Sequence, residues 1–205
     1  MAQATVADYA ALKAIYGEAS ELARRKLLSR LDRHCRNFIS ISPFLVIGSA
    51  SAAGPADVSP RGDAPGFVAV IDDRTLVIPD RPGNRLNDTL GNILENPQVA
   101  LIFFVPGMNE TLRVNGRAQI TSDETMLAPL AVQGKLPLSG ILVEVEEAFL
   151  HCAKALIRSR LWAAESQIDR RSFPSLGEMI SDQIEGLDRD TVDAQIAASI
   201  KKRLY

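Results

Sequence analysis

The chain contains little cysteine and no long apolar run. Only two cysteines, Cys35 and Cys152, occur among its 205 residues, so the sequence indicates no disulfide framework. No apolar stretch reaches the roughly 18–20 residues that a membrane-spanning helix needs. The polar N-terminus lacks the basic and apolar regions of a signal peptide. We therefore expect a cytoplasmic protein with no membrane partner.

The chain also has no surplus of positive charge. Its 23 Lys and Arg residues face 25 Asp and Glu residues, which gives a formal net charge of −2. Proteins that coat nucleic acid need a basic surface field, so we expect no nucleic-acid partner. GxSxG, Walker and GxGxxG motifs are absent, so acyl transfer, nucleotide hydrolysis and Rossmann-type cofactor binding lack support.

Hydrophobic periodicity predicts helices at both ends of the chain and short strands between them. The expected helices cover 8–32, 32–39, 84–95, 151–164, 175–186 and 188–204; the expected strands cover 44–47, 57–60, 67–71, 75–79, 99–105, 111–120 and 141–149. Short strands joined by tight turns favour a small antiparallel barrel over a doubly wound sheet. We predict a mainly β protein with a single domain over 1–205, a barrel core at about 40–150, and helical extensions over 1–39 and 151–205.

The segment 75–97 carries the strongest physical signal for a ligand. An apolar strand runs through a Pro/Gly turn into a helix whose expected first turn holds Asn84, Arg85, Asn87 and Asp88. Arginines near a helix start oppose the macrodipole unless an anion binds there, and the helix start also offers unpaired N–H groups. The pattern predicts a phosphate site, which is compatible with the simpler interpretation of Asn84 or Asn87 as an N-cap.

Other polar clusters leave two interpretations open. Arg61, between Pro60 and Gly62, is rigidly presented for an anion, or it pairs with Asp63 in an exposed loop. Arg113 and Arg117 share a strand face that lies either in solvent or in a dimer cleft. On the expected helix 151–164, a face with His151, Lys154, Arg158 and Trp162 either flanks a ligand or is an ordinary solvated face.

Metal binding has little support. The two His-Cys dipeptides, His34-Cys35 and His151-Cys152, lack the ligand spacing of zinc sites, so we expect no metal.

Taken together, the motifs resemble one family. SPRGD (59–63), PGF (65–67), IPDRPGNR (78–85), VALIFFV (99–105) and TLRVNGRA (111–118), with HCAKALIRSRLW (151–162), are similar to the pyridoxamine 5'-phosphate oxidase-like flavoproteins. Within that group they look like the FMN-dependent enzyme subgroup. The resemblance implies an antiparallel split β-barrel, the FMN-binding split barrel, that forms a homodimer with FMN at the subunit interface.

The resemblance also implies a set of cofactor-binding residues. Asn84 and Arg85, with Arg61, would hold the phosphate, and the segment Val77–Asp80 would run along the flavin ring. The full set is Ser59, Arg61, Gly62, Asp63, Val77, Ile78, Pro79, Asp80, Asn84, Arg85, Thr111, Arg113, Lys154, Arg158 and Trp162. Of these, Thr111 and Arg113 would reach the flavin of the other subunit. The sequence identifies no catalytic residue.

The functional prediction is an FMN-dependent oxidoreductase that acts on an unidentified small molecule. A non-catalytic flavin- or haem-binding carrier on the same fold is the alternative, and a plain dimeric interaction domain is a third. Two departures argue against pyridoxamine phosphate oxidation itself. Gly83-Asn84-Arg85 replaces the oxidase's serine-arginine-lysine cluster, and no C-terminal arginine-rich substrate motif occurs in 163–205.

Overall fold

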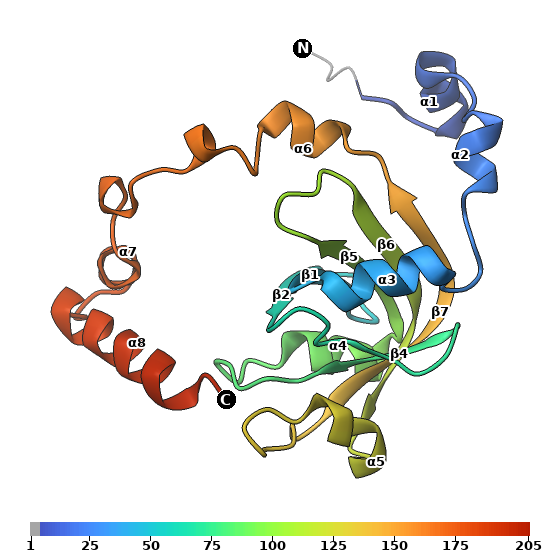
Figure 1. Cartoon of the computed structure of the whole chain (residues 1–205). Coiled ribbons are helices and arrows are strands. Elements are labelled where there is room, and N and C mark those ends of the chain that lie inside the picture. The colour runs from blue at the N-terminus through green and yellow to red at the C-terminus, as the bar shows by residue number, and fades with distance from the viewer. Residues whose placement is uncertain (1–4) are drawn as a thin grey trace.

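The computed structural model describes residues 5–205 and is built around one seven-stranded antiparallel sheet (Figure 1). The strands are β1 (Phe44–Ala50), β2 (Ala56–Gly62), β3 (Ala69–Val70), β4 (Thr75–Pro79), β5 (Gln98–Phe104), β6 (Thr111–Thr121) and β7 (Gly140–His151). Their order across the sheet is β2-β1-β5-β6-β7-β4-β3. The expected strand 67–71 shortens to the two residues of β3.

Alternating side chains of the sheet form the core. Leu45 and Ile47 on β1 and Leu101 and Phe103 on β5 are buried, because successive residues of a strand point to opposite faces. Helix α3 (Arg33–Ile41) packs against β6 and β7, and helix α4 (Asp88–Glu95) packs against β1, β2 and β6. Both helices bury one apolar face, as their sequence periodicity predicts.

The long β6–β7 hairpin contains a β-bulge between Asn115 and Gly116. A β-carbon at Gly116 would collide with the backbone carbonyl oxygen of Glu144 on the facing strand. Glycine is therefore required here by the close approach of the two backbones. Helix α5 (Glu124–Leu127) and a 3-10 turn (Ala128–Leu130) follow β6 and lead into β7.

The expectation of one helix over 8–32 is wrong. The segment forms two short helices, α1 (Tyr9–Tyr16) and α2 (Glu21–Arg25). Gly17 ends α1 with a φ of 72°, a conformation that L side chains rarely adopt. Ser20 then begins α2, because its hydroxyl accepts a hydrogen bond from the Ala23 N–H at 3.2 Å.

The N-terminal segment also extends one edge of the sheet. Strand β4 pairs with β7 only from Gly140 to Glu144. Beyond that point Leu28 and Ala148 exchange backbone hydrogen bonds of 3.0 and 2.7 Å, and the Lys26 Nζ donates to the carbonyl oxygen of Leu150 at 3.1 Å. The segment after α2 therefore covers part of the β7 edge that β4 leaves free.

The C-terminal segment consists of three helices that stand apart from the sheet. They are α6 (Lys154–Ser159), α7 (Leu176–Gln183) and α8 (Arg189–Arg203), with 3-10 turns at Ala164–Ser166 and Arg170–Ser172. Figure 1 shows this segment arching away from β7 and returning so that the chain end lies near the sheet. The helices expected at 175–186 and 188–204 are confirmed, with slightly shorter bounds.

The expected helix over 151–164 is wrong at both ends. Strand β7 continues through His151, and Arg160, at a φ of 52°, follows the last residue of α6. His151 and Trp162 therefore lie outside the helix, and the proposed helical stripe through His151, Lys154, Arg158 and Trp162 does not form. Within residues 5–205, no helix combines the length and apolar character that a membrane crossing requires.

Candidate functional site

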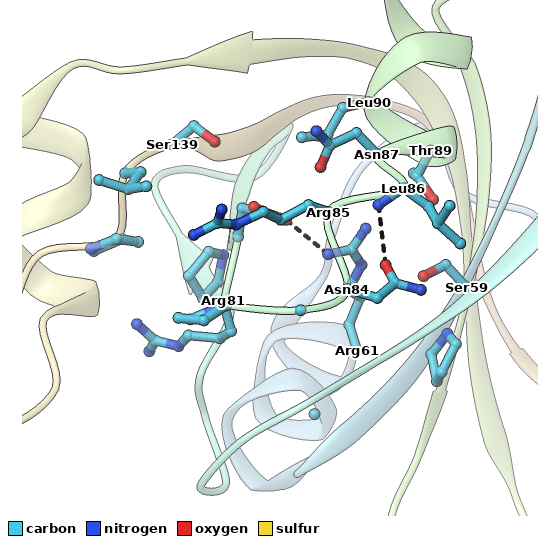
Figure 2. A pocket seen from close by; sticks show the side chains of 18 of the residues that line it. Ser59, Arg61, Arg81, Asn84, Arg85, Leu86, Asn87, Thr89, Leu90 and Ser139 are labelled. Atoms are coloured by element: carbon cyan, nitrogen blue, oxygen red, sulfur yellow. Dashed lines mark hydrogen bonds and ion pairs between the residues drawn. The ribbon is translucent and has the colours of Figure 1, made fainter. Parts of the chain in front are cut away.

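A cavity of about 1180 Å³ lies where the end of β2, the loop after β4 and the start of α4 meet (Figure 2). The loop before β7, residues 135–139, and the C-terminal residues Lys202 and Tyr205 complete its lining. Pockets for small molecules and cofactors measure about 300–1,000 Å³. The cavity therefore has room for a ligand of mononucleotide size.

The loop that precedes α4 is not helical, which corrects the expected start of this helix at 84. Helix α4 begins at Asp88. The Asn84 Oδ1 accepts a hydrogen bond from the Leu86 N–H at 3.1 Å, and Arg85 and Asn87 adopt left-handed φ values of 65° and 60°. Asparagine side chains compete with helical hydrogen bonds in this way, so residues 84–87 form a turn at the pocket.

The start of α4 has no side-chain cap. Asn87 occupies the N-cap position, yet its side chain makes no capping hydrogen bond. The leading N–H groups of a helix have no acceptor inside the helix, and they carry the positive end of its dipole. Arg85 lies two residues before this N-cap and lines the same cavity. Together Arg85 and these N–H groups place positive charge at the pocket wall, which the Asp88 carboxylate in the first turn of α4 offsets in part.

Two crossed ion pairs join the end of β2 to the loop after β4. The Arg61 Nη1 lies 2.8 Å from the Asp80 Oδ1, and the Arg81 Nε lies 2.7 Å from the Asp63 Oδ2. Arg61 and Asp63 therefore each pair with the loop after β4 rather than with each other. The Arg61 Nε is buried and has no hydrogen-bond partner, so Arg61 retains a donor that its ion pair does not use.

Asp63 is the most enclosed charge of the site, with 3% of its side chain exposed. Burial acts to raise the pKa of its carboxyl. Hydrogen bonds from the Ala64 N–H, the Tyr205 hydroxyl and Arg81 outweigh that effect, so the pKa lies below its usual value. Asp63 is therefore ionised at neutral pH, and its carboxylate accepts hydrogen bonds from these three donors.

The structure brings about half of the predicted site residues to this cavity. Those that line it are Ser59, Arg61, Gly62, Pro79, Asp80, Asn84 and Arg85. Asp63 contacts the lining residues Arg81 and Tyr205. The side chains of Val77 and Ile78 are buried in the core. Strand β3 pairs with β4 only at Leu76 and Val77. Ile78 and Pro79 therefore have no β3 partner.

The other predicted residues lie outside the cavity lining. Thr111 is buried on β6, and the Arg113 guanidinium lies 5.2 Å from the centre of the Phe149 ring. The Trp162 Nε1 donates to the carbonyl oxygen of Met108 at 2.7 Å. Lys154 and Arg158 are exposed on α6. Within one chain, this second group does not meet the first.

Sequence reasoning misses several residues of the pocket. It indicates only the charge of Arg81 near the helix, although the mirrored order Arg61-Gly62-Asp63 and Asp80-Arg81 suggests crossed pairs once the fold brings the two segments together. Lys135, Lys202 and Tyr205 carry no local signal, because they reach the pocket from distant parts of the chain. Among residues 5–205, no group of three or more His, Cys, Asp or Glu side chains could hold a metal ion.

The individual proteins that resemble this chain are solved structures of low sequence identity. No curated protein matches its sequence, whereas several solved structures match its fold. HupZ of Group A Streptococcus is 17% identical over 58% of this chain and 92% of its own, with a TM-score of 0.48. An FMN-binding protein from Syntrophomonas wolfei is 14% identical over 69% and 97%, with a TM-score of 0.46. An FAD binding protein from Mycobacterium smegmatis is 16% identical over 60% and 97%, with a TM-score of 0.42.

A family model provides the assignment. The model described as pyridoxamine 5'-phosphate oxidase matches residues 31–152, which include α3 and every strand of the sheet. The predicted mainly β fold, an antiparallel split barrel with flanking helices, is confirmed. The match covers more than half of the chain, and this chain therefore belongs to the pyridoxamine 5'-phosphate oxidase family.

Proposed function

We propose that the protein is an FMN-binding flavoprotein that acts as an FMN-dependent oxidoreductase on a small molecule. One observation carries the proposal. The uncapped start of α4, with Arg85 beside it, forms a positive locus on a cavity of about 1180 Å³ in a chain of this family. Anions bind at helix N-termini of this kind because the backbone donors and the helix dipole both favour negative charge.

The residues present fit the phosphate of FMN. Arg85 and the leading N–H groups of α4 would hold it at one end of the cavity. The buried Nε of Arg61 offers a further charge-assisted donor, while the Arg61 Nη1 keeps its contact with Asp80. Ser59, on the same wall, adds a hydroxyl. These donors are cationic and neutral N–H and O–H groups, as a phosphate requires; the carboxylates in the lining include Asp80, which is paired with Arg61, and Asp88, which lies in the first turn of α4.

The remainder of the cavity suits a planar ring. Pro79, at the end of β4 and beyond the residues that pair with β3, lines the cavity and offers the ring an edge of the sheet to lie along. Bound FMN would supply hydride-transfer chemistry. The contribution of the chain would be to orient the ring along this edge, to hold the phosphate and to exclude water from one face.

A homodimer would complete the site. The second group of predicted residues, Thr111, Arg113, Lys154, Arg158 and Trp162, lies outside the cavity of its own chain. We propose that a second copy of the chain brings this group to the open side of the cavity. The exposed apolar side chains of Val58, Leu86 and Leu138 at the cavity support an interface there, because such side chains become buried when partners associate.

An absorbance spectrum of the purified protein, followed by titration with FMN, tests the cofactor. We expect flavin bands or tight uptake of FMN with quenched fluorescence. A haem band would instead support the carrier function on this fold. A colourless protein that ignores FMN would refute the proposal.

Arg85→Ala tests the placement of the phosphate. We expect FMN affinity to fall roughly 10- to 100-fold, because a charge-assisted hydrogen bond contributes about 1.5–3 kcal/mol. The melting temperature should change little, since Arg85 is exposed. Arg36→Ala, which removes an exposed arginine of α3 outside the cavity, is the matched control. Equal affinity for both variants would place the phosphate elsewhere.

A further inference from the structure

The end of the chain contacts the pocket through Tyr205. Its hydroxyl donates to the Asp63 Oδ1 at 2.8 Å, and the Arg81 guanidinium lies 5.9 Å from the centre of its ring. The Lys135 Nζ donates to the Tyr205 carbonyl oxygen at 3.5 Å. Tyr205 therefore joins the ion pair of Asp63 and Arg81, and both Tyr205 and Lys202 line the cavity.

Helices α7 and α8 form a unit with its own polar contacts. The Ser175 hydroxyl donates to the Asp193 Oδ2 at 2.6 Å, the Gly177 N–H donates to the Asp193 Oδ1 at 2.9 Å, and Arg189 pairs with Glu178 at 3.3 Å. These bonds fix the two helices against each other. They do not involve the sheet.

The connection of this unit to the barrel is slight. Residues 163–174, between α6 and α7, are mostly exposed and form only short 3-10 turns. Trp162, through its bond to Met108, fastens the beginning of this connection, and Tyr205 fastens the far end of the unit. Figure 1 shows the arch between these two points. The position of α8 at the pocket therefore depends strongly on Tyr205.

We propose that the C-terminal segment, residues 189–205, is a detachable wall of the ligand pocket, which Tyr205 fastens to Asp63 and Arg81. The wall adds Lys202, a cationic residue, to the pocket lining and retains an anionic ligand. This inference rests on the proposed function, in which that ligand is FMN. Tyr205 is a positioning residue, because it acts by holding the wall in place.

The fastening can be removed without breaking the pocket itself. Asp63 keeps its bonds to the Arg81 Nε and the Ala64 N–H when the Tyr205 hydroxyl is absent. Tyr205→Phe therefore removes one hydrogen bond to a charged acceptor, while the ring stays beside Arg81. The folded barrel and the phosphate residues are left unchanged.

The first test measures FMN exchange in the full-length, FMN-loaded protein. Stopped-flow fluorescence would give the dissociation rate constant for the wild type, Tyr205→Phe and the control Tyr16→Phe, whose side chain is exposed on α1. We expect dissociation to be roughly 10-fold faster in Tyr205→Phe only, which corresponds to the lower end of the effect of losing one hydrogen bond to a charged group. Melting temperatures should agree within about 2 °C. An unchanged dissociation rate would overturn the proposal.

A second test needs no bound flavin. Hydrogen exchange of residues 189–203 should be faster in Tyr205→Phe than in the wild type, whereas exchange in β5 and β6 should be the same. If the wild type fails to bind FMN, the proposed function fails. Hydrogen exchange alone then tests whether Tyr205 holds residues 189–205 in place. Faster exchange confined to 189–203 supports the detachable wall, and equal exchange in all variants overturns it.

Discussion

Asp63 is the residue on which the polar contacts of the pocket converge. Its carboxylate accepts hydrogen bonds from Arg81, Tyr205 and the Ala64 N–H, and so connects the end of β2, the loop after β4 and the chain end. A carboxylate this enclosed is stable only while its donors remain, because an unpaired buried charge is costly. The site therefore depends on one ionisation state at this position.

Asp63→Asn should lower the free energy of unfolding by about 1–3 kcal/mol at pH 7, since it replaces a charged acceptor of three hydrogen bonds. The pKa of Asp63 in the folded state lies below the ordinary value of 3.8. Its stabilising contribution is therefore complete above that value and is lost as the pH falls through the folded-state pKa. Urea unfolding at several pH values between about 3 and 8 measures the effect.

The difference between the wild type and Asp63→Asn should stay constant from about pH 5 to 8 and should shrink below about pH 4. Asp182→Asn, at an exposed position of α7, serves as the control and should have little effect. A difference that persists unchanged down to about pH 3 would mean that the ionised carboxylate contributes nothing to the stability of this site.

At the scale of elements, the β6–β7 hairpin depends on the backbone contact at Gly116. Gly116→Ala should lower the free energy of unfolding by about 2–4 kcal/mol, because the added methyl collides with the Glu144 carbonyl and the strands must separate. Chemical denaturation provides the measurement. Gly91→Ala is the matched control, since its β-carbon meets no atom within 4 Å.

In the middle of α4, that control should be neutral or stabilising by up to about 1 kcal/mol, as alanine favours helices. If Gly116→Ala were as harmless as Gly91→Ala, the hairpin would not require close backbone contact at the bulge.

The elements that the sequence predicts well are those whose signal is local. The alternation along 111–120 and 141–149 predicts β6 and β7, since each strand buries one face. The start of α4 is missed because the residues 84–87 are compatible with a helix, and only the Asn84 side-chain bond to Leu86 and the left-handed Arg85 exclude it. The early end of α1 is missed for a different reason. Gly17 ends the helix, but the helical spacing of apolar residues continues past Gly17 in the sequence and therefore predicts a longer helix.

The same distinction holds for the site. The motifs at 59–63 and 79–85 each present arginine beside proline and glycine, so a local pattern predicts that they meet a ligand. The crossed pairing of Arg61 with Asp80 depends on how the folded chain brings the end of β2 to the loop after β4, which no local pattern gives. Tyr205 lies 142 residues from Asp63 in the sequence, so only the folded chain brings them together.

At the scale of the whole molecule, the two groups of predicted site residues are separated within one chain, which is the basis for the proposed dimer. Sedimentation equilibrium should give twice the chain mass of 22.3 kDa, with one FMN bound per chain. Diluting the protein until it dissociates should release FMN, because each cavity would lose the residues that the second copy supplies. A monomer that retains FMN at full affinity would contradict the shared site.

The bridge between Leu28 and Ala148 has a consequence for solubility. An uncovered strand edge presents N–H and C=O groups that can pair with a strand of another molecule, and such pairing leads to aggregation. The segment after α2 occupies the outer part of β7 with the Leu28 bonds and the Lys26 contact. It also places the Lys26 charge beside that edge, which discourages a further strand from pairing there. The N-terminal segment thereby protects the barrel from self-association at β7.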